Sequence, residues 1–303
     1  MDVIGVGALN LDHVVRGSSV GLPVARGTSG RVSASVVQPF VEVPPVLGGS
    51  AFNTISTLTA TGLGLGYVGV VGANAAHVSR LAALGVDHRF VFRADGMTGT
   101  CVSVVEGPDR TLLIHPGANE AMADYIDRAV DYLASARIVH VTSFLDALTP
   151  VRMAPVIRAV RARGALISLD PGHEWATSPS PAVLDLVSQA DYLFLNPTEF
   201  EALGPGPRTT VVKSREGATE IHNGTARFTP HEPLAPEQIT NPTGAGDTFA
   251  AGYLSALASD HPSNAAAEGL ALARRKLRGH PLNENGPVPH GTDPGKPGGG
   301  GGI

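Results

Sequence analysis

The feature that most constrains the fold of this 303-residue chain is a series of strand and helix patterns in its central region. Short apolar runs of strand length occur there with a longer helical pattern between them. The strand patterns span residues 138–142, 166–170, 192–195 and 209–213, and the helical pattern spans 150–163. Strands separated by helices predict a mostly parallel sheet with right-handed crossovers. The chain is also long enough for one large α/β domain with a well-filled core.

The composition excludes several classes of protein. Lys and Arg number 22 and Asp and Glu 27, so the net charge is −5 and no basic stripe points to a nucleic-acid partner. The single cysteine, Cys101, cannot form an internal disulfide and fits a reducing compartment. The N-terminal residues lack the basic region of a signal peptide, and no apolar run approaches the length of a membrane span. We therefore expect a cytoplasmic protein without a membrane partner.

A turn with two glycines leads directly into an apolar helical pattern. Residues 241–249 read Asn-Pro-Thr-Gly-Ala-Gly-Asp-Thr-Phe. The free N–H groups of a first helical turn, together with the helix dipole, form an anion site, and Gly244, Ala245 and Gly246 would supply them here. Asp247 lies in the same turn, where a carboxylate can accept a proton from a nucleophile while the N–H groups hold a phosphate. The alternative is that Asp247 only caps the helix, although a cap does not require two glycines.

Polar residues near the N-terminus predict a second binding region. Asp12 follows a predicted strand, at the end where open α/β sheets usually bind ligands. Further along, Gly48 and Gly49 allow a close backbone approach, and Ser50 is expected to cap a helix that projects Asn53 back toward the glycine pair. Each group also has a structural interpretation, because loop carboxylates and glycine pairs before helices are common.

Acidic and amide side chains also follow two of the central strand patterns. Asn196 ends one pattern and Glu199 lies in the first turn of the next predicted helix, which sets an amide beside a carboxylate. Such oxygen groups suit Mg²⁺, which keeps several waters and takes few protein ligands. Alone, the pair is also typical of a helix N-cap with an acidic first turn. Asp170 ends another strand pattern and either faces the ligand crevice or braces the following turn.

Three of these motifs together resemble the PfkB (ribokinase-like) family of sugar and nucleoside kinases. They are Thr-Gly-Ala-Gly-Asp-Thr-Phe at 243–249, Gly-Gly-x-x-x-Asn at 48–53 and Asn-x-x-Glu at 196–199. The resemblance covers most of residues 1–279. It implies a ribokinase-like three-layer α/β sandwich with a mostly parallel central sheet and a small β lid.

The resemblance also implies a domain organisation. Residues 1–279 would form the kinase domain, with lid strands within about 13–47 and 99–115. The Gly- and Pro-rich residues 281–303 are expected to be a disordered tail, because they offer little apolar surface to bury. A homodimer formed through the lid is a further hypothesis.

The activity that the resemblance implies is transfer of the γ-phosphoryl group of ATP to a hydroxyl, with Mg²⁺ as cofactor. Asp247 would be the catalytic base, beside the N–H groups of Gly244, Ala245 and Gly246. Three further sets of residues would bind acceptor, metal and nucleotide. They are Asp12, Gly48, Gly49 and Asn53 for the acceptor, Asn196 and Glu199 for Mg²⁺, and Lys213, Ser214, Glu216 and Gly217 for the nucleotide.

The sequence departs from the family pattern at two places. The loop after residues 209–213 is one residue short and has Arg215 where a glycine is usual, so ATP is implied less strongly than phosphoryl transfer. Asn241 replaces the Asp that many relatives carry before the turn, which leaves K⁺ activation in doubt. Few aromatic residues are available to stack a base, which favours a sugar-like acceptor. A nucleoside kinase, or a catalytically weak regulator that binds sugar or nucleotide, is the alternative.

Overall fold

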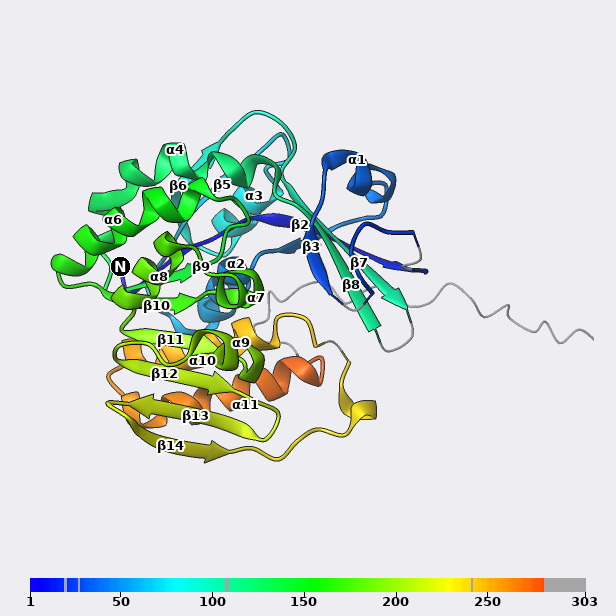
Figure 1. The fold of residues 1–303 in the computed structure, drawn as a ribbon. Coiled ribbons are helices and arrows are strands. Elements are labelled where there is room, and N and C mark those ends of the chain that lie inside the picture. Colours follow the sequence, from blue (N-terminus) through cyan, green and yellow to red (C-terminus); the bar gives the residue numbers. More distant parts are fainter. Residues whose placement is uncertain (19–20, 27, 107–108, 241, 281–303) are drawn as a thin grey trace, which may run out of the picture.

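The computed structural model describes residues 1–18, 21–26, 28–106, 109–240 and 242–280, which contain two sheets (Figure 1). The larger sheet has nine strands in the order β14-β13-β12-β11-β10-β9-β1-β5-β6. The strands from β12 to β6 in this order are parallel, and β13 and β14 add an antiparallel hairpin at one edge. Their bounds are β1 (Val3–Val6), β5 (Leu65–Val71), β6 (Asp87–Arg93), β9 (Ile138–Thr142), β10 (Leu166–Asp170), β11 (Tyr192–Leu195), β12 (Thr209–Lys213), β13 (Gly217–His222) and β14 (Thr225–Pro230).

Helices cover both faces of this sheet, which explains why its inner strands are almost continuously apolar. Every residue of β1, β5 and β9 is buried. One face carries α4 (Met122–Tyr125), α5 (Val130–Leu133), α6 (Leu148–Ala162), α7 (Gly172–Thr177), α8 (Pro181–Gln189) and α9 (Pro197–Leu203). The other face carries α2 (Ser50–Leu58), α3 (Ala76–Ala83), α10 (Ala245–Ala258) and α11 (Ala265–Leu277). The predicted three-layer α/β architecture is therefore confirmed.

The smaller sheet projects from the edge of the molecule where the parallel strands end (Figure 1). Its five strands have the order β3-β8-β7-β2-β4. They are β2 (Asn10–Arg16), β3 (Ser29–Arg31), β4 (Val46–Gly48), β7 (Gly99–Glu106) and β8 (Asp109–His115). Because β2 follows directly after β1, the two sheets are linked by a short connection at this edge.

One segment of the N-terminal region differs from the sequence-based expectation of strands alone. Residues Ala34–Val37 form the short helix α1, and Val37 is fully buried against the second sheet. A four-residue helix is too short to produce a helical hydrophobic period, and its valines favour a strand assignment from sequence. The helical conformation of residues 34–37 is therefore determined by the packing of Val37 against the second sheet.

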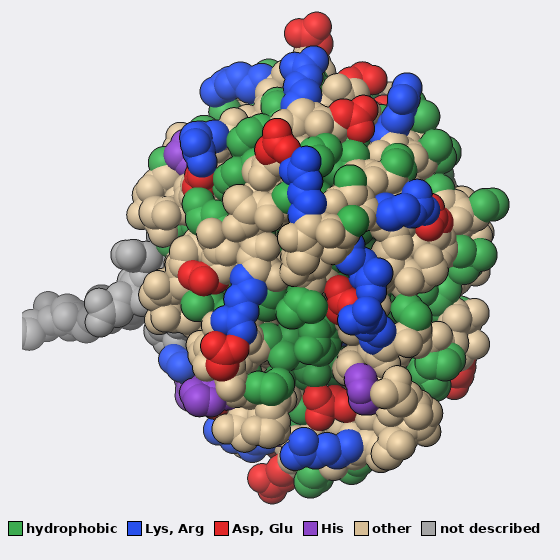
Figure 2. All heavy atoms as spheres, turned by 90° about the vertical axis from the view of Figure 1, so that its left-hand side faces the viewer, with side chains coloured by type: hydrophobic (Ala, Val, Ile, Leu, Met, Phe, Trp, Pro, Cys, Tyr) green, Lys and Arg blue, Asp and Glu red, His purple; other side chains and the backbone are tan. Residues whose placement is uncertain are grey.

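The surface opposite the second sheet carries charges of both signs. Figure 2 shows Lys and Arg side chains interspersed with Asp and Glu over this face. In the described part of the chain, no helix is long and apolar enough to cross a bilayer. The predicted disordered tail 281–303 and Asn241 lie outside the described residues.

Candidate active site

The N-termini of α2 and α10 meet at the edge where the parallel strands end. Asn53 on α2 donates from Nδ2 to Asp247 Oδ2 across 2.8 Å. One residue further along, Thr54 Oγ1 lies 3.2 Å from the backbone carbonyl of Asp247 and donates to it. The structure thus brings the glycine-pair motif and the glycine turn together, although they are far apart in the sequence.

The glycine turn begins α10, and one of its three predicted anion donors is already engaged, because the Ala245 N–H donates to the Pro242 carbonyl at 3.3 Å. Gly244 is the N-cap of α10 and has φ 76°, in the left-handed region that favours glycine. The helix begins at Ala245, and Asp247 lies in its first turn. Asp247 is therefore not the capping residue, and its carboxylate is available for contacts outside the helix.

The electrostatic environment of Asp247 suits proton transfer near neutral pH. Burial raises the pKa of its carboxyl to about 6, and the negative charge of Asp170 adds to this rise. Hydrogen bonds from Asn53 and Ser50 and the positive charge of Lys213 act in the opposite direction. A carboxylate with a pKa close to the working pH can both accept and release a proton.

Ser50 does not cap α2, contrary to the prediction. The N-cap is Gly49, no side chain caps this helix, and Ser50 is its first residue. The Ser50 hydroxyl instead contributes a hydrogen bond that lowers the pKa of Asp247. The glycine with positive φ moved the helix start by one residue, which sequence patterns do not resolve.

A buried ion pair lies beside the glycine turn. Lys213 Nζ is 2.6 Å from Asp170 Oδ2, and the two side chains are 15% and 13% exposed. Burial alone would lower the pKa of the Lys213 ammonium, but the neighbouring Asp170 raises it overall. A Cβ added to Gly246 would be only 3.5 Å from Lys213 Nζ. A lysine cation therefore borders the predicted anion site.

Asp170 braces the turn after β10 and also pairs with Lys213. Its Oδ1 accepts from the N–H of Gly172 at 3.3 Å, which braces the turn after β10, and its Oδ2 accepts from Lys213. It was not included among the predicted site residues. The only sequence signal was its place at the carboxyl end of a parallel strand.

Asn196 and Glu199 form a reciprocal capping box at the start of α9. Glu199 Oε2 accepts from the Asn196 N–H at 2.8 Å, and Asn196 Oδ1 accepts from the Glu199 N–H at 2.9 Å. Burial raises the pKa of Glu199, as does the charge of Asp170. The N-cap interpretation of this pair is therefore correct, and it leaves a buried carboxylate and an amide near Lys213.

These side chains could bind Mg²⁺ only together with water molecules and phosphate oxygens of a nucleotide. Among the described residues, no group of three or more His, Cys, Asp or Glu side chains could hold a metal by itself. Mg²⁺ commonly takes one or two carboxylates, several waters and phosphate oxygens. Glu199 and Asp170, with the Asn196 amide, match that donor set when a nucleotide supplies the phosphates.

The glycine pair lies against Asp12 of the second sheet. A Cβ at Gly48 would be 2.0 Å from Asp12 Oδ2, so only glycine leaves room for this carboxylate. Gly49 has φ 118°, and a Cβ there would be 2.1 Å from the Ala8 carbonyl. Sequence reasoning identified both glycines, and the structure gives each a steric reason.

Asn119 is a buried amide at the connection between β1 and β2, and the sequence indicates it near the acceptor only through its place at the end of a predicted strand. Its Oδ1 accepts from the Leu9 N–H at 2.9 Å, and its Nδ2 donates to Leu9 O at 3.2 Å and to Asn10 Oδ1 at 3.0 Å. Asn119 therefore fixes the backbone at the β1–β2 connection and orients the Asn10 side chain.

The predicted nucleotide loop closes on itself between β12 and β13. Ser214 N–H donates to Gly217 O at 2.8 Å, and the Glu216 N–H donates to Ser214 Oγ at 3.2 Å. Gly217 has φ 151°, and a Cβ there would be 2.2 Å from the Thr229 carbonyl. Of the predicted nucleotide residues, Lys213 lies beside the glycine turn.

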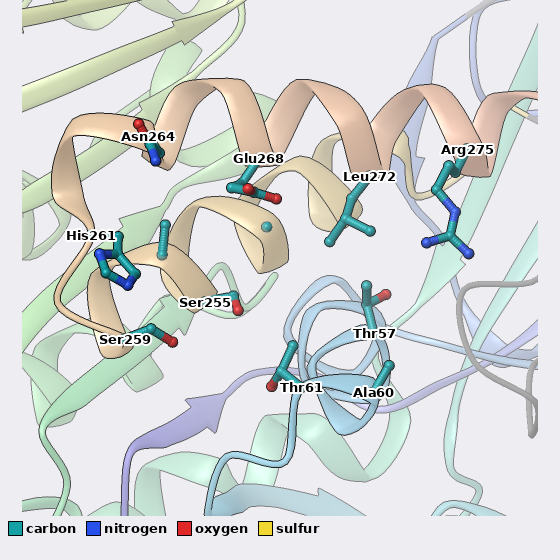
Figure 3. A pocket seen from close by; sticks show the side chains of 12 residues that line it. Thr57, Ala60, Thr61, Ser255, Ser259, His261, Asn264, Glu268, Leu272 and Arg275 are labelled. Carbon is teal, nitrogen blue, oxygen red and sulfur yellow. The ribbon is translucent and has the colours of Figure 1, made fainter.

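A hollow of about 380 Å³ lies on the flank of α2, α10 and α11 (Figure 3). Thr57, Ser255, Glu268 and Arg275 are among the residues that line it. None of the candidate site residues contributes to its wall. The hollow lies along the sides of α2, α10 and α11, away from the N-termini of α2 and α10 that form the site, so it is a separate feature.

Comparison with known proteins agrees with this geometry. A sequence model described as "pfkB family carbohydrate kinase" matches residues 42–275. An uncharacterized sugar kinase of Archaeoglobus fulgidus is 29% identical over 65% of this chain and 84% of that protein. An ATP-dependent ribose-1-phosphate kinase of Halopiger xanaduensis is 28% identical over 70% of this chain and 74% of that protein.

Solved structures with similar folds include two kinases with bound ligands. Adenosine kinase from Schistosoma mansoni, solved with 2-fluoroadenosine, has a TM-score of 0.80, 16% identity and coverage of 91% of this chain and 95% of that chain. A protein from E. coli assigned as a ribokinase II, solved with ATP and Mg²⁺, has a TM-score of 0.71, 19% identity and coverage of 91% and 92%. At these identities the likeness concerns the fold.

Proposed function

This chain belongs to the pfkB family of carbohydrate kinases and is a phosphotransferase with an alcohol acceptor, and from that premise we propose that it transfers the γ-phosphoryl group of ATP to a hydroxyl of a sugar or sugar-like molecule. The observation that carries the proposal is the contact between Asn53 and Asp247. It joins the motif expected to bind the acceptor to the helix start expected to hold the phosphoryl group.

Asp247 is the proposed catalytic base. With a pKa raised to about 6 by burial, its carboxyl is mostly ionised at neutral pH and accepts the proton of the acceptor hydroxyl. Asn53 and Ser50 hold the carboxylate through hydrogen bonds, so it is positioned before the acceptor arrives.

Charge on the transferred phosphoryl group is proposed to be stabilised by the start of α10. The N–H groups of Gly244 and Gly246 and the helix dipole provide fixed positive partial charge, and the Ala245 N–H would join them by releasing the Pro242 carbonyl. Lys213 adds a full positive charge beside Gly246, and Asp170 keeps it there. Positioning and electrostatics of this kind are the main contributions that phosphoryl transfer needs from a protein.

Mg²⁺ is proposed to be held near Asn196 and Glu199, where it would neutralise charge on the nucleotide phosphates when bound. The capping box fixes both residues through each other's backbone N–H groups. Burial raises the pKa of Glu199, and a bound cation would counteract this by favouring the ionised form.

The acceptor is proposed to lie between the second sheet, acting as a lid, and the starts of α2 and α10. Asp12, Gly48, Gly49 and Asn53 would contact its hydroxyls. Four phenylalanines could stack a base, namely Phe40, Phe52, Phe90 and Phe92. Phe40 is partly buried against the second sheet and the other three are engaged elsewhere, which supports a sugar over a nucleoside. Phe52 is 4% exposed, Phe90 stacks on Tyr132 with centroids 4.5 Å apart, and Phe92 stacks on Tyr125 at 4.7 Å.

An ADP-release assay with Mg²⁺ and ATP tests the proposal. Ribose, fructose, ribose 1-phosphate, adenosine and cytidine would be offered separately, with Asp247→Asn as the control for contaminating kinases. We expect ADP formation that depends on a sugar-class acceptor and is lost in the control. Activity with the nucleosides alone would favour the nucleoside-kinase alternative, and acceptor-independent or absent ADP formation would contradict the proposal.

A further inference from the structure

His77 is a buried histidine behind the acceptor half of the proposed site. It lies on α3, is 0% exposed, and its Nε2 is 3.1 Å from the Gly48 carbonyl oxygen. Its ring meets the ring of Phe52 edge to face, with centroids 4.9 Å apart. The roles proposed for Gly244 to Gly246 and for Asp247 do not require an imidazole at this position.

The hydrogen-bond geometry determines which nitrogen of His77 carries the proton. A carbonyl oxygen can only accept, so Nε2 must be the donor to Gly48. Nδ1 is buried and has no hydrogen-bond partner within the described residues. Burial lowers the pKa of His77 to about 4, more than the carbonyls of Gly48 and Asn10 raise it, so the ring is neutral.

The Gly48 carbonyl belongs to the peptide that carries the acceptor motif. This peptide is planar, so a fixed Gly48 carbonyl also fixes the direction of the Gly49 N–H on its opposite side. Gly48 packs directly on the Asp12 carboxylate, and the Gly49 carbonyl accepts from the Asn53 N–H at 2.9 Å. One imidazole therefore supports the backbone segment that carries Gly48, Gly49 and Asn53 and that packs on Asp12.

We infer that His77 is a positioning residue for acceptor binding: a neutral imidazole whose Nε2–H holds the Gly48–Gly49 peptide in the orientation that the acceptor needs. The inference rests on the proposed function, because it assigns His77 to the site proposed there. The buried Nδ1 has no hydrogen-bond partner among the described residues, and such a group costs free energy. An apolar side chain of similar size would fill the space without this cost. The donor at Nε2 is the property that an apolar residue lacks.

Two substitutions separate the donor from the packing. His77→Phe keeps a ring beside Phe52 and removes the donor, whereas His77→Gln keeps an N–H donor at a similar reach. His88→Phe is the control, because it removes an imidazole bonded to the Val86 carbonyl at 3.0 Å on β6, the edge strand of the larger sheet.

We expect His77→Phe to raise the KM for the best acceptor of the panel by at least about tenfold. In the same variant, the dissociation constant of ATP measured without acceptor should change less than about twofold. His77→Gln should keep both the acceptor KM and the ATP dissociation constant within about threefold of the wild type. An unchanged acceptor KM in a folded His77→Phe protein, equal losses for ATP and acceptor, or no rescue by His77→Gln would overturn the inference.

A measurement on the wild-type protein keeps the inference testable if His77→Phe does not fold. Long-range ¹H–¹⁵N spectra of ¹⁵N-histidine-labelled protein report the tautomer of each ring. We expect the His77 ring to carry its proton on Nε2 and to stay neutral from pH 8 to pH 5, and the second buried ring of low pKa, His140, should also stay neutral over this range. His77→Gln assigns that signal, and a cationic or Nδ1-protonated His77 would overturn the inference.

The outcome also distinguishes this inference from the proposed function. If Asp12→Ala raises the acceptor KM and His77→Phe does not, only the role of His77 is wrong. If neither Asp12→Ala nor Asp247→Asn changes activity, the proposed function itself is wrong.

Discussion

Asn53 donates a hydrogen bond of 2.8 Å to the Asp247 carboxylate, although 194 positions separate the two residues in the chain. The contact fixes the first turn of α2 against the first turn of α10. Since one helix start is proposed to bind the acceptor and the other to bind phosphate, the predictions below test each half separately.

Asp247→Asn is expected to lower turnover by about 10²–10⁴, as for the loss of a general base. The amide is nearly isosteric and still accepts from Asn53, so the fold should be retained. Steady-state rates with the best acceptor measure the effect. Turnover comparable to the wild type would remove Asp247 from the base role.

The same substitution should stabilise the protein at alkaline pH. The pKa of Asp247 in the folded state, about 6, lies above its ordinary value of 3.8. Its stabilising contribution is therefore complete below pH 3.8 and is lost as the pH rises through 6. The difference in Tm between variant and wild type should be larger at pH 8 than at pH 4, measured by calorimetry. A difference independent of pH would contradict the raised pKa.

The acidic limb of the kcat/KM profile should report the same carboxyl near pH 6. Asn53→Ala removes a hydrogen bond that lowers this pKa, so the limb should move to higher pH, while Asp170 and Lys213 remain in place. The profile is measured with acceptor held well below its KM. A limb that does not move would show that Asn53 contacts the acceptor without tuning the base.

Gly48→Ala is expected to cut kcat/KM for the acceptor by at least about tenfold, because the new Cβ would collide with Asp12. Gly17→Ala is a matched control, since nothing lies within 4 Å of a Cβ at that position. ATP affinity without acceptor should be unchanged in both variants. Equal weakening of ATP binding and acceptor use would contradict the division of the site into two halves.

Lys213→Met leaves Asp170 as a buried carboxylate without its cation, so we expect a loss of stability of up to about 3–5 kcal/mol and a raised KM for ATP. The double variant with Asp170→Asn should regain much of the stability and none of the ATP affinity. Denaturant unfolding and ATP titration separate the two effects. Recovery of ATP affinity in the double variant would show that Lys213 is purely structural.

Glu199→Gln should raise the Mg²⁺ concentration needed for half the maximal rate, because a charged oxygen near the proposed ion is lost. Glutamine still completes a capping box, so α9 should remain intact. Rates across a Mg²⁺ titration provide the test. An unchanged Mg²⁺ dependence would leave Glu199 as a capping residue alone.

The central strands could be predicted from sequence because each is an apolar run bounded by polar residues. Strands β9, β10, β11 and β12 have the predicted bounds. The hairpin of β13 and β14 was missed, since most of its residues are partly or fully exposed and show little apolar alternation. Such edge strands are stabilised mainly by hydrogen bonds to the neighbouring strand, and strand pairing cannot be read from a single sequence.

Within the site, sequence could identify residues whose type carries the chemistry, such as Asp247 and Asn53. It could not identify the partners that fix them. The pairing of Lys213 with Asp170 and the contact of His77 with Gly48 join segments far apart in the chain. Each depends on which strand ends and helices become neighbours, and that follows from the topology of the sheet.

The division of the site between two sheets has a consequence for how its specificity can change. Asp12 and Gly48 belong to the second sheet, whereas Lys213 ends a strand of the larger sheet and Asp247 starts a helix that covers it. Under the proposed function, substitutions and insertions in the second sheet would therefore reshape the acceptor side of the site while the residues proposed to transfer the phosphoryl group stay constant. One scaffold can in this way diversify from one acceptor to another during evolution, with its reaction preserved.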